Sequence, residues 1–236
     1  MTATTIGLVS GDLAATARLR DLTIDEFVAR LSSSDPVPGG GSASAIAAGL
    51  GASLVAMVAS LSEGRPKYAA HADLHAEARA AGVRLADRFL SLADEDAAAY
   101  AAFAAALKLP RDDNAQAVAR RAALLRASAR AAAEVPLRCV EACLELVSYA
   151  EALAGRSNPN ASSDLTVAAL LGDAAARGAG ANVLANLPSV GDPSFEDETT
   201  ARLLDLLREI DDLATIAREV VSRGEAREPL QLASEG

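Results

Sequence analysis

The chain has 236 residues, 51% of them apolar, which is enough to bury the core of one large domain. Its formal net charge of −10 excludes a general nucleic-acid binder, because phosphate neutralisation requires clustered lysine and arginine. Aromatic residues make up only 3% of the chain and alanine is abundant, so the composition predicts closely packed helices, an all-α fold, and not a sheet.

Residues 1–20 are interpreted as an N-terminal extension ahead of the helical domain. They have no basic region before their weakly apolar stretch, so they lack the layout of a secretory signal, and we expect a cytoplasmic protein. Thr23 followed by Glu26 is the pattern of a capping box. This pattern predicts a first helix that ends near Ser32.

The stretch PVPGGGS (36–42) places glycines directly ahead of an apolar segment that meets no charge before Glu63. Glycine tolerates backbone angles closed to other residues, and we expect Ser42 to cap the helix that follows. The free N–H groups and positive dipole end of that helix could then bind a carboxylate. A tight turn that permits close packing is an equally good interpretation of the glycines.

Residues 43–61 are long enough to cross a bilayer, but alanine, glycine and serine make them only weakly hydrophobic. We therefore expect no membrane span and interpret the segment as a helix buried on all sides by other helices. Gly49 and Gly51 would allow close backbone approach, including across a subunit interface.

The rest of the chain is a succession of predicted helices. After a break at Gly64 and Pro66, helices are expected at about 69–107, 112–153, from Ser163 to before Pro188, and 197–223. Pro136 would kink or break the second of these, and Gly155 ends it. No shift in composition marks a boundary, so residues 21–223 are predicted to form one antiparallel helical bundle. Residues 224–236 are expected to be a flexible tail.

Cys139 and Cys143 lie four residues apart and would share a helix face without the usual reach for an unstrained disulfide. We interpret them as buried small apolar residues. His71 and His75 could complete a metal set with them, but the spacing matches no familiar zinc pattern. We therefore predict no metal site and place both histidines on a solvated helix face.

Separated stretches of the sequence carry a resemblance to a known family. They are FVARLSSSDPVPGGGSASAIAAGLGASLVAMVASLSEGRPKY (27–68), SLADEDAAAYAAFAAALKLP (91–110) and SNPNASSDLTVAALLGDAAARGAGANVLANL (157–187). In order and spacing they resemble the signature segments of the cyclodeaminase/cyclohydrolase family. This family comprises the C-terminal domain of formiminotransferase-cyclodeaminase and stand-alone relatives, including methenyltetrahydrofolate cyclohydrolases.

The resemblance implies an all-helical homodimer that binds a tetrahydrofolate derivative near the subunit interface, with no cofactor beyond this substrate. The implied reaction is either closure of 5-formiminotetrahydrofolate to 5,10-methenyltetrahydrofolate with loss of ammonia, or addition of water to the methenyl bridge. The motif positions implied as site residues are Gly39, Gly40, Gly41, Ser42, Arg65, Lys67, Tyr68, Asp94, Asp96, Asn158, Asn160, Ser163, Asp164, Asn182 and Asn186. One departure is Ser157, where the family usually has glycine, preceded by an inserted Gly155 and Arg156.

Both reactions need a group that moves protons at one amidine-like carbon. Asp96 has small apolar neighbours, and burial among them could raise its pKa, so we expect it to be the acid/base, with Asp164 as second choice. Asp94 would face elsewhere on the helix. Each residue also has a plain interpretation: 94–96 could be a solvated acidic turn, and Asp164 a helix cap.

The polar loop and the cations have similar alternatives. Asn158 and Asn160 could be ordinary turn residues. Arg65 and Lys67 follow a helix end, where cations suit the dipole, or they could attract the glutamate carboxylates of a folate.

Two function classes stay open at the level of sequence. One is a folate one-carbon enzyme, and the other is a catalytically silent helical dimer that serves as a ligand-binding or interaction module. The joint presence of PGGGS, DED and NPNASSD favours the enzyme. No formiminotransferase domain is recognised in this sequence, which slightly favours the cyclohydrolase reaction. The sequence supports the two reactions almost equally.

Overall fold

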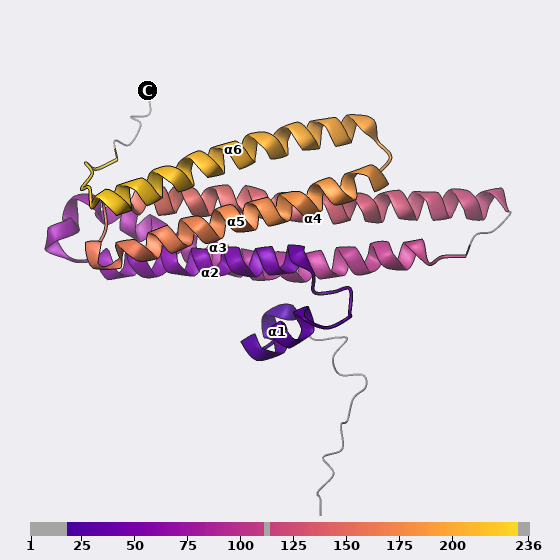
Figure 1. Ribbon diagram of the computed structural model, residues 1–236, viewed down its shortest axis with the longest axis horizontal. Helices are drawn as coiled ribbons and strands as arrows, with labels where there is room; N and C mark the ends of the chain where they lie inside the picture. Colours follow the sequence, from indigo (N-terminus) through magenta and orange to yellow (C-terminus); the bar gives the residue numbers. More distant parts are fainter. Residues whose placement is uncertain (1–17, 111–113, 231–236) are drawn as a thin grey trace, which may run out of the picture.

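The computed structural model describes residues 18–110 and 114–230, and within them it contains helices and no strand (Figure 1). The long helices lie side by side along one axis, while the short α1 lies outside their bundle. The α-helices are α1 (Ile24–Leu31), α2 (Gly40–Ser62), α3 (Ala72–Leu107), α4 (Ala115–Leu153), α5 (Ser162–Asn186) and α6 (Pro193–Arg223). Short 3₁₀ helices are η1 (Leu19–Asp21), η2 (Pro66–His71), η3 (Pro159–Ala161) and η4 (Leu187–Ser189). The predicted all-α fold is confirmed.

Local signals set most of the helix ends. The capping box at α1 is present, since the Thr23 side chain accepts from Glu26 N and the Glu26 carboxylate accepts from Thr23 N. Gly155, at φ +75°, follows the end of α4 as expected. Of the two alternatives expected at Pro136, a kink or a break, the break is wrong, because α4 continues through it as one helix. Pro136 is buried there, and packing outweighs the lost backbone hydrogen bond.

Small residues let the helices approach closely. A Cβ added at Gly82 would lie 2.7 Å from the carbonyl oxygen of Ala52, and one at Gly172 would lie 2.5 Å from Val147 Cγ2. No side chain fits at such distances, so α2 packs against α3, and α4 against α5, through glycine and alanine. Larger buried side chains such as Phe89 fill the remaining space between the helices.

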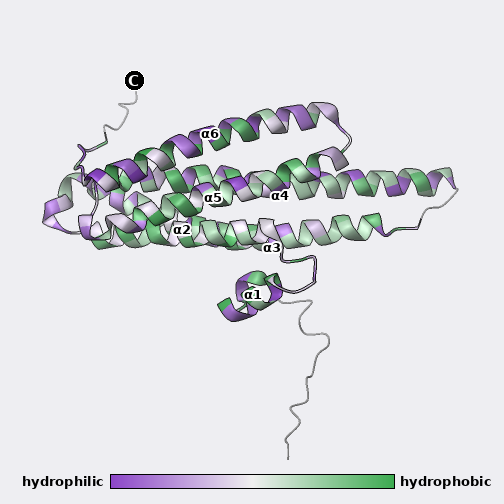
Figure 2. Cartoon of the chain, viewed as in Figure 1, coloured by the Kyte–Doolittle hydropathy of each residue, from purple (hydrophilic) through white to green (hydrophobic). Residues whose placement is uncertain are grey.

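One side of α2 is exposed in the single chain. By length and composition α2 could cross a membrane, but half of its most apolar window is buried against other helices, chiefly α3 and α5. Its other side exposes Leu50, Met57 and Leu61, and apolar residues run along the whole helix (Figure 2). The expectation that the helix is buried on all sides is therefore wrong for one chain, because its neighbours cover only part of it.

The start of the described chain is attached to the bundle. Leu19 is buried and its backbone N–H donates to Asp94 Oδ1 on α3. Leu19, within the expected extension, therefore contacts the bundle, while residues 1–17 lie outside the described part of the chain.

The segment after α6 is also attached, at least as far as Glu228. Arg227 N donates to Gly155 O at 2.9 Å, and Arg156 Nε donates to Glu228 O at 2.6 Å. The expectation of a loose tail from Gly224 is wrong for this stretch, because the connection between α4 and α5 provides it with hydrogen-bond partners. Residues 231–236 lie outside the described part of the chain.

The predictions for the cysteines and for the histidines have different outcomes. Cys139 and Cys143 are free and buried in the core, as predicted. His75 is 1% exposed and its Nε2 lies 2.8 Å from Arg156 O, so its expected place on a solvated face is wrong: the α4–α5 connection covers it. His71 is partly buried. In residues 18–110 and 114–230, no group of three or more metal-ligating side chains gathers.

Candidate active site

The glycines at the start of α2 do not adopt the backbone angles for which glycine was expected to be needed there. Gly39 is the N-cap of α2, with φ at −122°, and none of the glycines from 39 to 41 has a positive φ. Ser42 is not the cap either, because its side chain lies inside the first turns of the helix, fully buried. Both expectations are wrong because α2 begins at Gly40, three residues before the start at residue 43 that a cap at Ser42 required.

Gly41 is needed for the close approach of a carboxyl group. A Cβ at Gly41 would lie 2.6 Å from Asp96 Cγ and 2.7 Å from Asp96 Oδ2, and closer still to Oδ1. Any side chain at residue 41 would therefore occupy the space that the carboxyl group of Asp96 fills. The close-packing interpretation of the glycines holds at this position.

The carboxyl group of Asp96 is held by Ser42. Ser42 Oγ donates to Asp96 Oδ2 at 2.9 Å and also lies 3.3 Å from Ala93 O. Burial raises the pKa of Asp96, and the hydrogen bonds from Ser42 lower it in part. No cation among the described residues pairs with Asp96. A carboxyl group in this setting is suited to exchange a proton closer to neutrality than an ordinary aspartate.

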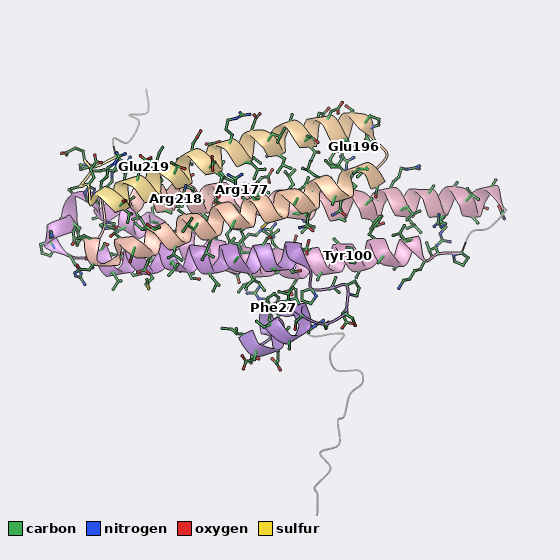
Figure 3. All side chains as sticks on the ribbon, viewed as in Figure 1. Phe27, Tyr100, Arg177, Glu196, Arg218 and Glu219 are labelled. Atoms are coloured by element: carbon green, nitrogen blue, oxygen red, sulfur yellow. The ribbon has the colours of Figure 1, made fainter. Side chains whose placement is uncertain are left out.

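A pocket of about 290 Å³ opens beside this carboxyl group, and we call it the Asp96 pocket. The start of α2 and its preceding loop, α3, α4 and the end of α5 form its walls. Its lining residues are Pro36, Val37, Gly39, Gly40, Gly41, Asp96, Tyr100, Ala132, Asn182, Ala185 and Asn186. Sequence analysis missed Tyr100, which lies on α3 near the start of α2 (Figure 3). Its spacing of four residues from Asp96 was a usable signal, because residues so spaced share a helix face.

Two amides on α5 face the Asp96 pocket. Asn182 Nδ2 donates to Gly178 O at 2.9 Å, and Asn186 Nδ2 donates to Ala132 O at 2.8 Å. These bonds fix both side chains. Among the described residues, no donor reaches the Oδ1 atom of either amide, so both oxygens can accept hydrogen bonds from a ligand.

The neighbours of Asp96 in the DED motif have other partners. Asp94 accepts the backbone N–H of Leu19 and does not line the Asp96 pocket. Glu95 pairs with Arg88 at 2.6 Å and with Arg138 at 2.8 Å. The two aspartates therefore face different sides of α3, as expected, and do not form a carboxylate dyad.

The remaining expected site residues lie at the opposite end of the bundle, and we call them the far group. Its members are Arg65, Lys67, Tyr68, Asn158, Asn160, Ser163 and Asp164. The 23 residues of α2 separate this end from the Asp96 pocket, which corresponds to about 33 Å at the helical rise. One chain therefore does not bring Asp96 and Asp164 together.

Several members of the far group shape the backbone. Asn158 is buried, its N–H donates to Ser62 Oγ at 2.8 Å, and its Oδ1 accepts from Asn160 N at 3.1 Å. This is the turn role noted as the plain interpretation of both asparagines. Asp164 lies in the first turn of α5, which begins at Ser162, so it is not the helix cap.

The sequence and the fold match proteins of one family. The model of the formiminotransferase-cyclodeaminase family matches residues 23–205. The chain is 36% identical over 189 residues to methenyltetrahydrofolate cyclohydrolase of Methylorubrum extorquens, covering 79% of this chain and 89% of that protein. It is 36% identical over 196 residues to formimidoyltransferase-cyclodeaminase of Mus musculus, covering 81% of this chain but only 35% of the mouse protein.

A solved structure shares the fold. The formiminotetrahydrofolate cyclodeaminase of Thermotoga maritima superimposes with a TM-score of 0.78 at 23% identity, covering 86% of this chain and 96% of that one. The family model spans most of the chain and the matched region holds both the Asp96 pocket and the far group. This chain therefore belongs to the formiminotransferase-cyclodeaminase family.

Proposed function

We propose that this chain is a folate one-carbon enzyme that acts at the one-carbon bridge of a tetrahydrofolate derivative. The observation that carries the proposal is the partly buried carboxyl group of Asp96, held by Ser42 in the wall of a pocket of about 290 Å³. A silent module would have no chemical need for a carboxyl group whose pKa is raised at the edge of a ligand-sized cavity.

In the cyclohydrolase reaction Asp96 acts first as base and then as acid. Its carboxylate accepts a proton from water as the water oxygen bonds to the methenyl carbon. In the resulting tetrahedral intermediate the bond from carbon to N5 breaks, and N5 takes a proton from the carboxylic acid. The remaining hydroxyl proton leaves to solvent as the formyl C=O forms, so 10-formyltetrahydrofolate and one proton are released.

The cyclodeaminase reaction uses the same proton movements. N10 attacks the carbon of the protonated formimino group (–CH=NH2+), and Asp96 accepts the N10 proton. Asp96 then returns this proton to the –NH2 group of the tetrahedral intermediate, whose C–N bond breaks to release ammonia and leave the methenyl cation. The Methylorubrum relative of similar length, named as a cyclohydrolase, favours the first reaction. The mouse relative and the Thermotoga structure, both named for cyclodeaminase, support the second as the alternative.

The rest of the Asp96 pocket suits a flat heterocycle. The free Oδ1 atoms of Asn182 and Asn186 can accept N–H groups of a pterin ring. Tyr100 is 42% exposed and can pack its ring against the face of such a ligand.

One absorbance experiment tests the function. The purified chain is incubated with 5,10-methenyltetrahydrofolate and, separately, with 5-formiminotetrahydrofolate, while the absorbance of the methenyl compound is followed. Loss of the signal in the first sample identifies a cyclohydrolase, and a rise in the second identifies a cyclodeaminase. If neither signal changes while folate still binds, the protein is a silent ligand-binding module and the proposal is wrong.

We further infer that the chain forms a homodimer through the exposed side of α2 and the adjoining side of α5. These packed helices expose Leu50, Met57, Leu61, Val167 and Leu170, each between 39% and 58%. Several large exposed apolar side chains on two adjoining helices are typical of a subunit interface. A two-fold axis across the middle of α2 would make the paired α2 helices antiparallel. The far group of the partner would then lie beside the Asp96 pocket and complete it.

Light scattering of matched variants tests the dimer. Leu50→Arg places a charge in the inferred interface and should give a monomer at micromolar concentration with reduced turnover. Leu204→Arg, on the exposed side of α6, is the control and should stay dimeric. A wild-type chain that is monomeric at micromolar concentration would contradict the inference.

A further inference from the structure

A second cavity lies at the end of the bundle opposite Asp96, and we call it the far-end pocket. It encloses about 300 Å³ between η2, the α4–α5 connection, the last turns of α6 and the segment after α6. Its walls include Lys67, His71, Arg156 and Arg227. The chain after α6 runs to this end of the molecule (Figure 1), beyond the last residue of the family match.

Arg156 is buried in the wall of this pocket without a carboxylate partner. It is 7% exposed, its Nε donates to Glu228 O at 2.6 Å, and its Nη1 donates to Ala152 O at 3.0 Å. Within the described residues, no group accepts from Nη2 and no acidic side chain pairs with the guanidinium. Burial lowers the pKa of Arg156, and the nearby Arg227 lowers it further. A buried cation in this state favours an anion beside it.

His71 provides a second unsatisfied group in the same wall. Its Nδ1 is buried and has no hydrogen-bond partner among the described residues. Burial lowers the pKa of His71, and His75 and Arg156 lower it further, while Glu228 raises it. These surroundings favour the neutral ring, and a bound anion would favour its protonated form.

The acidic side chains nearby do not neutralise the buried guanidinium. Glu151 pairs with Arg227, with Nη1 and Oε1 2.6 Å apart. Glu225 and Glu228 are exposed to solvent. Lys67 adds a cation at the mouth of the pocket, where it lies 5.4 Å from the centre of a tyrosine ring and forms no ion pair with a described residue. An anion in the pocket would therefore meet unpaired cations.

We propose that the far-end pocket is a second ligand site, which binds a small molecule through a carboxylate or phosphate group. The oxyanion accepts hydrogen bonds from Arg156 Nη2 and from the protonated Nδ1 of His71, and Lys67 adds attraction at the mouth. This site shares no residue with the Asp96 pocket of its own chain, although Lys67 and Tyr68 in its walls belong to the far group. Binding at Arg156 and His71 can be measured without turnover, so its failure and that of the proposed reaction are distinguishable. The anion is either a free metabolite or the glutamate end of a folate.

Histidine NMR provides the test, because the chain has only two histidines. A single His71→Gln variant assigns both ring signals. The full chain is titrated at constant ionic strength with sodium phosphate, L-glutamate and p-aminobenzoyl-L-glutamate, the last representing the glutamate end of a folate. We expect saturable shifts of the His71 signals and a higher His71 pKa in the bound state. Saturation by phosphate or L-glutamate identifies a free anion, and saturation by p-aminobenzoyl-L-glutamate alone identifies the folate end.

Variants decide whether the pocket is responsible. Arg156→Gln removes the buried charge and should weaken binding about tenfold or more. Arg223→Gln is the matched control, since this cation on α6 pairs with Glu219 and does not line the pocket. The proposal is overturned if no probe gives saturable shifts in the wild-type chain, or if Arg156→Gln binds as tightly as wild type.

A second variant covers the case in which Arg156→Gln does not fold. Lys67 is exposed, so Lys67→Glu should fold normally and weaken binding about fivefold at low ionic strength. Unchanged affinity in that variant also overturns the proposal.

Discussion

Replacing Gly41 by alanine tests whether the position of the Asp96 carboxyl group controls turnover. The new Cβ would lie 2.6 Å from Asp96 Cγ, whereas carbon atoms in contact are about 3.5–4.0 Å apart. The carboxyl group must therefore retreat by about 1 Å. That movement lengthens or breaks its hydrogen bond from Ser42 Oγ, which is 2.9 Å in the wild type.

The expected loss is large in rate and small in stability. A displacement of about 1 Å at a reacting group can lower the rate about 10²-fold, which corresponds to about 2.7 kcal/mol in activation free energy. Folding should suffer less, because alanine in a helix is favoured over glycine by about 0.5–1 kcal/mol, and this offsets part of the strain.

Initial rates with methenyltetrahydrofolate, together with thermal unfolding followed by circular dichroism, measure the two effects. Gly49→Ala is the control on the same helix, since its added Cβ would meet Phe89 Cβ at an ordinary 3.5 Å. We expect the control to keep wild-type turnover. A folded Gly41→Ala variant with wild-type kcat would refute the assignment of Asp96 to the reaction.

Three further predictions rest on the same contacts. Asp96→Asn should lower turnover about 10²- to 10⁴-fold with binding retained. Burial raises the pKa of Asp96 above the ordinary 3.8, so the native wild type binds this proton more tightly than the unfolded chain and loses stability as pH rises from about 4 through the folded pKa. The Tm of the variant relative to wild type should therefore increase as pH rises above about 4. Ser42→Ala removes a hydrogen bond that lowers the pKa of Asp96, so the acid limb of the kcat profile should move to higher pH, and an unchanged profile would exclude Ser42 from this role. Gly82→Ala should destabilise by about 1–3 kcal/mol in urea unfolding through overpacking against α2, whereas Gly49→Ala should not.

Local chemistry made much of the fold predictable. Thr23 with Glu26, and the glycine at 155, fix helix ends through caps and backbone angles that depend on neighbours in sequence. The apolar neighbours of Asp96 were likewise visible in sequence, and they are what makes its burial possible. Such features need no knowledge of how helices pack.

Contacts between helices could not be predicted from the sequence. Ser42 and Asp96 are 54 residues apart, and only the packing of α2 against α3 shows that one holds the other and that Gly41 leaves the space. The burial of His75 depends in the same way on a loop 81 residues later. The length of α2 alone was enough to predict that the far group lies far from Asp96. The family resemblance grouped these motifs as one site, and the distance that α2 puts between them was overlooked.

The close packing of helices through alanine and glycine has a consequence for how the protein responds to temperature. Heat capacity rises on unfolding mainly because apolar surface becomes hydrated, and globular proteins average about 12–15 cal/mol/K per residue. A core in which Gly82 and Gly172 lie at helix contacts exposes little apolar side-chain surface at those contacts when it opens. The heat-capacity increment per residue should therefore fall at the low end of that range. The stability curve of this protein should then be flat, with cold denaturation far below the freezing point.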